Sequence, residues 1–160
     1  MKYIIAYDLG TGGIKTSLFD ENGVSQASAF ESYETHFPQS GWHEQKPEDW
    51  WNSVISSTKT MLQKTGVDVK DIVSLAVSGT SLGVIPIGKD GSLLVDQVPI
   101  WSDGRAVAQA EEFFRKTDEE TWYLTTGNGF PDHLYGIFKI MWYRDNLPEV
   151  YEKAQSFIGT

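Results

Sequence analysis

The sequence has 160 residues, a formal net charge of −9 and no cysteine. This length allows one domain with a real core, and 40% hydrophobic with 13% aromatic residues indicates a well-packed globular chain. The acidic balance argues against nucleic acid or an anionic membrane surface as a partner. The absence of cysteine excludes disulfides and thiolate metal sites. Because no apolar run could span a membrane and no signal-peptide pattern opens the chain, we expect a cytoplasmic protein.

The first 30 residues predict three antiparallel strands. An apolar strand over 2–7 runs into Asp8, small residues over 10–13 form a turn, and the strand pattern resumes over 14–19. A second turn precedes a third strand over 24–30. Phosphate-binding P-loops and dinucleotide fingerprints both continue into a helix, so the resumed strand excludes them.

The opening hairpin therefore places an acid on its entering strand and backbone N–H groups at its tip. Such a turn can cradle phosphate oxygens while Asp8 holds a magnesium ion through water. The alternative is an ordinary glycine-rich hairpin without a ligand.

The middle of the chain predicts a helix followed by a buried strand. Pro47 opens the helix with two acids in its first turn, and Gly66 ends it. The continuous apolar run over 72–78 is typical of a central strand in a sheet that is covered on both faces. A short strand over 84–87 and an extended stretch ending at Trp101 follow.

The last third of the chain predicts mainly helices. Ser102 or Asp103 is expected to cap one helix, and a capping box over 117–120 opens a short helix that ends near Gly127. Another helix is expected over 134–145, and two more elements are expected to begin at Pro148 and Ser156. Without repeats or linkers, the whole pattern predicts one α/β domain with a mixed sheet.

Four segments in this order resemble the FGGY family of carbohydrate kinases. They are Asp8 to Lys15, Gly41 to Trp51, the Trp-x-Asp-x-Arg stretch from Pro99 to Ala106, and Lys139 to Val150. The match covers essentially the whole chain, and the Trp-Ser-Asp-Gly-Arg wording is similar to the xylulokinase branch.

The resemblance implies an actin-like, ribonuclease-H-like fold and the ATP-dependent phosphorylation of a sugar or polyol hydroxyl, with a ketose such as xylulose as the leading acceptor. It also implies that residues 1–160 are a fragment, the single N-terminal domain of a longer kinase that can form a homodimer. The adenosine pocket and the general base belong to a second actin-like domain, expected beyond Thr160, so the isolated fragment should be inactive and hold no catalytic base.

For the phosphates of ATP, the resemblance singles out the opening hairpin. Asp8 is similar to the family's metal and phosphate Asp, which acts on Mg²⁺ through water. Thr11, Gly12 and Gly13 would offer N–H groups and the Thr11 hydroxyl to the γ-phosphate. Lys15 resembles the cation after this turn, and its alternative is a solvated strand lysine.

For the sugar, the resemblance singles out Ser81, Trp101 and Asp103. Asp103 would accept hydrogen bonds from two sugar hydroxyls, and its alternative is a helix N-cap. Trp101 would form an apolar wall or belong to the core. Arg105 is expected to be structural and to pair with an acid such as Glu44.

One segment departs from the family. Where xylulokinases have Met-His and glycerol kinases have Arg-Glu, this chain has Ser81 and Leu82, which puts both xylulose and glycerol in doubt. Ser81 could donate to a hydroxyl or satisfy local backbone. A second class of function is a non-catalytic actin-like ATP-binding or sensor module, which need not retain Asp103 beside an aromatic wall.

Overall fold

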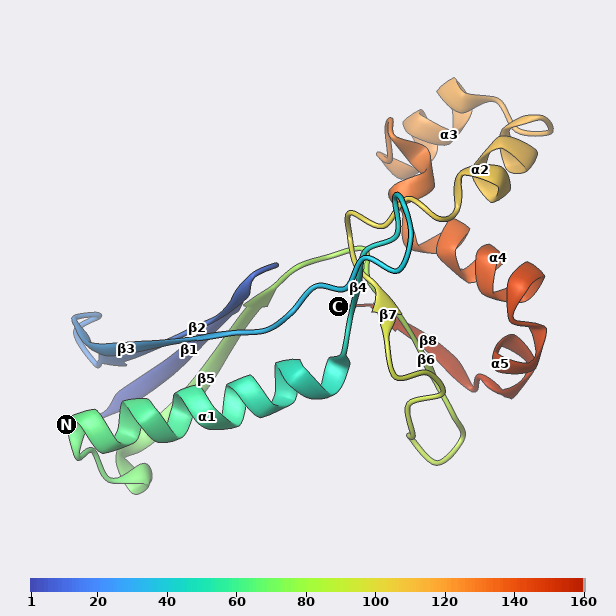
Figure 1. The fold of residues 1–160 in the computed structure, drawn as a ribbon. Coiled ribbons are helices and arrows are strands. Elements are labelled where there is room, and N and C mark those ends of the chain that lie inside the picture. The colour runs from blue at the N-terminus through green and yellow to red at the C-terminus, as the bar shows by residue number, and fades with distance from the viewer. Residues whose placement is uncertain (160) are drawn as a thin grey trace. The chain divides into compact units, whose positions relative to one another are not determined.

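The computed structural model describes residues 1–159. The chain separates into two compact units. The first comprises residues 1–35 and 46–80, and the second comprises residues 36–45 and 81–159. Figure 1 colours the chain by residue number, so that both segments of each unit can be followed in it.

The first unit is built on a mixed four-stranded sheet in the order β3-β2-β1-β5. Strands β1 (Tyr3–Leu9), β2 (Gly13–Asp20) and β3 (Ser25–Ser32) pair antiparallel in sequence order, as the alternation of strand and turn signals predicts. Strand β5 (Ile72–Gly79) follows the short 3-10 turn η1 (Val69–Asp71) and pairs parallel with β1. The α/β class and the three-stranded antiparallel opening are therefore confirmed.

Helix α1 (Pro47–Thr65) packs over β2 and β3 on one face of this sheet (Figure 1). Proline occupies its first turn, and Gly66 ends it in the left-handed conformation with φ of 66°, donating its N–H to the Leu62 carbonyl. Beneath the helix, the Tyr7 and Thr58 hydroxyls lie 2.8 Å apart. The predicted limits of this helix are confirmed. The buried hydrophobic residues between helix and sheet are Ile5, Tyr7, Ile14, Leu18, Ala29 and Met61.

The prediction of a central, covered strand over 72–78 is wrong. Strand β5 lies at the end of the sheet order, and Val73, Leu75 and Val77 are 58%, 62% and 74% exposed. Since α1 packs over β2 and β3, none of the described residues covers most of β5 or pairs with its outer edge. An apolar run indicates that a strand tends to be buried, but it does not indicate which element covers that strand.

The second unit combines helices with short strand pairs. Strand β4 (Glu44–Gln45) pairs antiparallel with β7 (Val98–Pro99), and β6 (Val84–Ile87) with β8 (Ser156–Gly159). The helical elements are α2 (Val107–Phe114), α3 (Glu119–Thr126), the 3-10 turn η2 (Asp132–Leu134), α4 (Gly136–Asn146) and α5 (Pro148–Lys153). The buried hydrophobic residues that they share are Val84, Ala106, Ala110, Phe138, Trp142 and Tyr143.

The helix caps of this unit differ from the predicted ones. Helix α3 lies where the sequence predicts it, with Gly127 at its end, but the N-cap is Asp118 and not Thr117 of the predicted capping box. Asp118 accepts the Thr121 N–H at 2.8 Å. Neither Ser102 nor Asp103 caps α2, because this helix begins at Val107 with Ala106 as its N-cap and without a side-chain bond. The N-cap alternative for Asp103 is therefore wrong.

Candidate functional site

The opening hairpin has a tight glycine turn that leads from strand to strand. Strand β1 ends at Leu9, β2 begins at Gly13, and the Gly10 N–H donates to the Gly13 carbonyl at 3.0 Å across the turn. No helix follows, so the exclusion of a P-loop is confirmed. The turn can present main-chain donors to an anion only through its tip.

Asp8 stands in a polar row on one face of the sheet. Its cross-strand partners are Lys15 on β2 and Ser78 on β5, and all three residues are exposed. Residues directly opposite one another in neighbouring strands project to the same face. Since Tyr7 is buried under α1, the Asp8 row lies on the face opposite the helix. This row places a carboxylate and an ammonium beside the turn.

Two of the glycines in the turn have different surroundings. A Cβ atom at Gly13 would lie 2.4 Å from the Glu31 carbonyl oxygen and 2.5 Å from the Phe30 ring, so β3 approaches too closely for any side chain. A Cβ atom at Gly12 would meet nothing within 4 Å. Gly13 is therefore required by the packing of the hairpin, whereas the space at Gly12 is open to a ligand.

Tyr33 is a residue of this region that the sequence did not single out. Its hydroxyl donates to the Gly10 carbonyl and so ties the chain after β3 to the turn. Burial raises the pKa of the Tyr33 phenol to about 12, and the negative charge of Asp8 contributes to this rise. The phenol therefore stays protonated at neutral pH and donates a hydrogen bond to the turn. No sequence signal marked it, because Tyr33 lies beyond the predicted end of the third strand.

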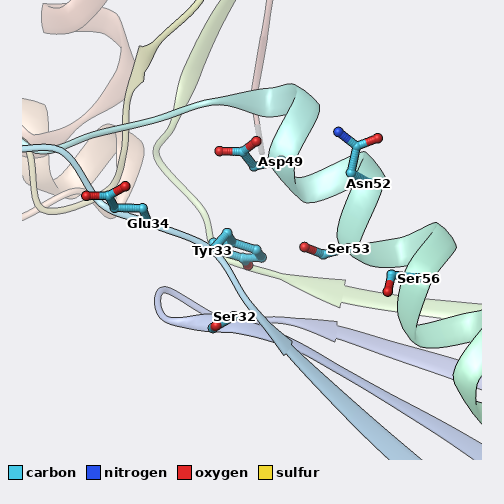
Figure 2. A pocket seen from close by; sticks show the side chains of 7 residues that line it. All are labelled: Ser32, Tyr33, Glu34, Asp49, Asn52, Ser53 and Ser56. Carbon is cyan, nitrogen blue, oxygen red and sulfur yellow. The ribbon is translucent and has the colours of Figure 1, made fainter.

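Tyr33 also lines a polar hollow of about 340 Å³ between the end of β3 and the start of α1. Figure 2 shows four side chains of α1 on one side of it and the segment from Ser32 to Glu34 on the other. Its lining residues are Ser32, Tyr33, Glu34, Asp49, Asn52, Ser53 and Ser56.

The residues of the hairpin fit a magnesium ion that keeps most of its water. Within residues 1–159 there is no group of three or more His, Cys, Asp or Glu side chains that could enclose a metal. Mg²⁺ is commonly bound through one or two carboxylates, phosphate oxygens and waters, so the single exposed carboxylate of Asp8 suits it.

In the second unit, Asp103 is fully buried and both of its carboxylate oxygens are engaged. Oδ1 accepts from Arg105 N and Nε at 3.1 and 2.8 Å, and Oδ2 accepts from His43 N and Arg105 Nη2 at 2.7 and 2.8 Å. A sugar hydroxyl could reach this carboxylate only by displacing these donors. The sugar-binding role of Asp103 stays a prediction, and its geometry favours a structural role.

Arg105 joins this carboxylate to a second one. Its Nη2 donates to Glu44 Oε1 at 2.6 Å, which confirms the predicted pairing. The guanidinium also lies 4.0 Å from the Trp42 ring centroid and 4.8 Å from that of Trp142. Burial lowers the pKa of Arg105, but the bonds and charges of Asp103 and Glu44 outweigh this and raise it.

Trp101 and Ser81, the other predicted sugar contacts, are exposed in the same unit. Trp101 is 43% exposed, which fits a wall that a ligand could cover better than a core position. Ser81 precedes Leu82, which has a φ of 65° and is the only described residue other than glycine with positive φ. Next to Trp101, His43 Nδ1 and Ser102 Oγ lie 2.8 Å apart.

Lys139 is the second residue that the sequence did not assign. It lies on α4, its side chain is fully buried, and its Nζ donates to the Leu82 and Ile100 carbonyls at 3.0 and 2.6 Å. These carbonyls adjoin Ser81 and Trp101. The only sequence signal was the position of Lys139 at the start of the fourth FGGY-like segment.

The predicted residues thus fall into two groups. The residues predicted to bind phosphate lie in the first unit, and Ser81, Trp101 and Asp103 lie in the second.

A profile of the FGGY family of carbohydrate kinases, N-terminal domain, matches residues 3–160. The chain belongs to this family.

Individual FGGY kinases match over nearly the whole chain. A xylulose kinase of Bacillus subtilis (strain 168) is 28% identical over 158 residues, 99% of this chain and 31% of its own length. A glycerol kinase of Rhizobium meliloti (strain 1021) is 28% identical over 152 residues, 95% of this chain and 30% of its own. The chain therefore spans about a third of the length of the curated relatives that it matches.

Solved FGGY kinase structures share its fold. A ligand-bound xylulose kinase from Lactobacillus acidophilus superposes with a TM-score of 0.87 at 28% identity, covering 98% of this chain and 31% of the other. A gluconate kinase from the same organism gives 0.88 at 29% identity, with coverages of 98% and 31%. The expected actin-like, ribonuclease-H-like fold is confirmed.

Proposed function

We propose that this chain is the N-terminal domain of a longer kinase that transfers a phosphoryl group from ATP to a sugar or polyol hydroxyl. The observation that carries the proposal is the opening hairpin, with exposed Asp8 and Lys15 side by side and open space at Gly12. Membership of the FGGY family supports the same chemistry. The rest of the full-length protein would supply the adenosine pocket and the general base.

In this proposal the hairpin binds the phosphates. Main-chain donors from Thr11 to Gly13 and the Thr11 hydroxyl approach the γ-phosphate, and Lys15 offsets its charge. Asp8 would hold Mg²⁺ through water, and the chemistry that this ion would supply is neutralisation of charge on the phosphoryl group. Tyr33 holds the turn in place through the Gly10 carbonyl.

The acceptor would lie against the second group of residues. Trp101 offers an exposed apolar surface for a carbon chain, and Ser81 offers a hydroxyl. We propose a ketose such as xylulose as the leading acceptor, because relatives are named xylulose kinases. Glycerol and gluconate, named for other relatives, are the competing acceptors. The acceptor is a small molecule, and the reaction would take place in the cytoplasm.

The test is acceptor-dependent ADP release by the full-length protein. D-xylulose, glycerol and D-gluconate are assayed with ATP and Mg²⁺, beside an Asp8→Asn variant prepared in the same way. We expect one acceptor to stimulate ADP release in the wild type, and the variant to lose most of that stimulation. ATP binding without ADP release on a wider sugar panel would instead support the sensor module.

A further inference from the structure

Lys139 brings a charged group into the core of the second unit, where an apolar side chain would ordinarily lie. Its side chain is fully buried, next to Phe138 on α4, which is also fully buried. Burial lowers the pKa of Lys139 to about 8, although the negative charge of Asp103 opposes this and Arg105 adds to it. A cation kept at such a position needs a reason beyond filling space.

The bonds of its Nζ supply that reason. The amine donates to two carbonyls from separate segments, Leu82 at 3.0 Å and Ile100 at 2.6 Å. An ammonium has three donors and a neutral amine still has two, so both bonds persist in either protonation state. An apolar residue of the same length would leave both carbonyls without this donor.

The backbone is strained at Leu82, and the Ile100 carbonyl accepts two hydrogen bonds. Leu82 is held at a φ of 65°, a region that side chains with a Cβ rarely adopt, and its carbonyl accepts from Lys139. The Ile100 carbonyl accepts from Lys139 and also from the Asp103 N–H at 3.1 Å. One side chain thus fixes the backbone directly beside Ser81 and directly beside Trp101.

We propose that Lys139 is a positioning residue for the sugar site. Through the Leu82 and Ile100 carbonyls it holds the backbone next to Ser81 and the backbone next to Trp101 at a fixed separation. The proposal rests on the proposed kinase function. Lys139 touches neither substrate nor phosphate in this role, because its amine is enclosed by protein. It acts through the backbone that carries the two candidate contacts.

The first readout is independent of any reaction. In the full-length protein, Lys139→Met keeps the length of the side chain and removes its donors. The Asp103 amide shares the Ile100 carbonyl with Lys139, so its hydrogen exchange reports the tether directly. We expect exchange of the peptide over 100–105 to rise about tenfold in the variant, while peptides from α1 keep their wild-type rates.

The second readout separates positioning from a general structural role. With the acceptor that the panel selects, Lys139→Met should raise the acceptor KM about tenfold and leave the KM for ATP within about twofold. Phe138→Leu is the matched control, because its ring packs on Phe113, Phe114 and Trp122 of the adjacent helices. The control should lose thermal stability while retaining the wild-type acceptor KM and exchange over 100–105.

If Lys139→Met does not fold, Lys139→Gln replaces it, since this variant keeps polar N–H donors on a side chain that is one bond shorter and cannot reach both carbonyls. The same rise in exchange and in acceptor KM is expected. Wild-type exchange over 100–105 in a folded variant overturns the proposal, and so does a wild-type acceptor KM. If no acceptor releases ADP even from the wild type, the kinase function has failed, and the exchange readout alone decides whether Lys139 holds the two segments.

Discussion

Replacing Asp103 with serine separates the two roles that this residue could have. Serine is neutral and has one oxygen, whereas the carboxylate accepts four hydrogen bonds from Arg105 and His43. In Asp103→Ser, the Arg105 side chain, only 3% exposed, retains Glu44 as its acidic partner. The variant therefore leaves a buried cation with half of its compensating charge.

The magnitude follows from the burial of the pair. Removing one partner of a buried ion pair costs about 3–5 kcal/mol, because the other charge stays in the protein interior. The lost acceptor for the His43 N–H adds about 1–3 kcal/mol, and the Glu44 bond offsets part of the sum. We expect the free energy of unfolding to fall by about 3–5 kcal/mol.

Urea denaturation of the full-length protein measures this loss, and the acceptor KM is measured on the same samples. The double variant Asp103→Ser/Arg105→Met should recover part of the stability, because it removes the uncompensated cation. The sequence alone predicts a different outcome for Asp103→Ser, in which the stability is kept and the affinity for the sugar is lost. Stability within about 0.5 kcal/mol of wild type, together with a raised acceptor KM, would refute the structural argument.

The other predictions concern the hairpin, the isolated chain and the buried lysine. Gly12→Ala should leave the free energy of unfolding near that of the wild type and raise the KM for ATP. Gly13→Ala should lower the free energy of unfolding by about 1–3 kcal/mol in a denaturation curve, because its Cβ meets Glu31 and Phe30. Equal stabilities of the two variants would contradict this. Asp8→Asn in the full-length enzyme should lower kcat far more than it raises the acceptor KM, and steady-state kinetics showing the reverse would mean that Asp8 binds the acceptor. The isolated 160-residue chain should show no acceptor-dependent ADP release, since the base and the adenosine pocket are expected elsewhere; turnover by material free of host kinases would disprove this. The pKa of Lys139 falls from 10.5 to about 8 on folding, so the unfolded chain binds more protons than the folded one between these pH values. The free energy of unfolding should therefore rise with pH in this range, relative to Lys139→Met, by at most about 1.4 kcal/mol per pH unit. Identical slopes in the two proteins would contradict the pKa shift.

Most of the features that the sequence predicted well are specified by neighbouring residues, and the exception is the Arg105–Glu44 pair, which rests on the family resemblance. The first hairpin follows from alternating residues and a glycine turn, and α1 follows from Pro47 and Gly66 at its ends. The Arg105 pairing with Glu44 was expected from the family-like segments that contain these residues. The hairpin and the helix depend on local signals, whereas the ion pair joins two motifs that are 61 positions apart.

The features that the sequence missed depend on residues far apart in the chain. Strand β4 has two residues and pairs with β7 across more than fifty positions, which no local pattern can report. Lys139 lies among apolar residues of α4, and only the folded unit brings the Leu82 and Ile100 carbonyls to it. For Asp103, the Trp-x-Asp-x-Arg spacing indicated importance but not that protein donors occupy both oxygens. Tyr33 was missed because it lies beyond the predicted third strand and contacts Gly10, which is 23 positions earlier in the chain.

The uncovered strand β5 affects how residues 1–160 behave when produced alone. Its outer edge presents backbone donors and acceptors without a strand partner among the described residues, beside the exposed side chains of Val73, Leu75 and Val77. Such an edge can recruit the same strand from another copy and start aggregation. The net charge of −9 opposes this encounter by repulsion, and salt weakens that repulsion. We therefore expect low-salt buffers to favour the monomeric state of the isolated chain.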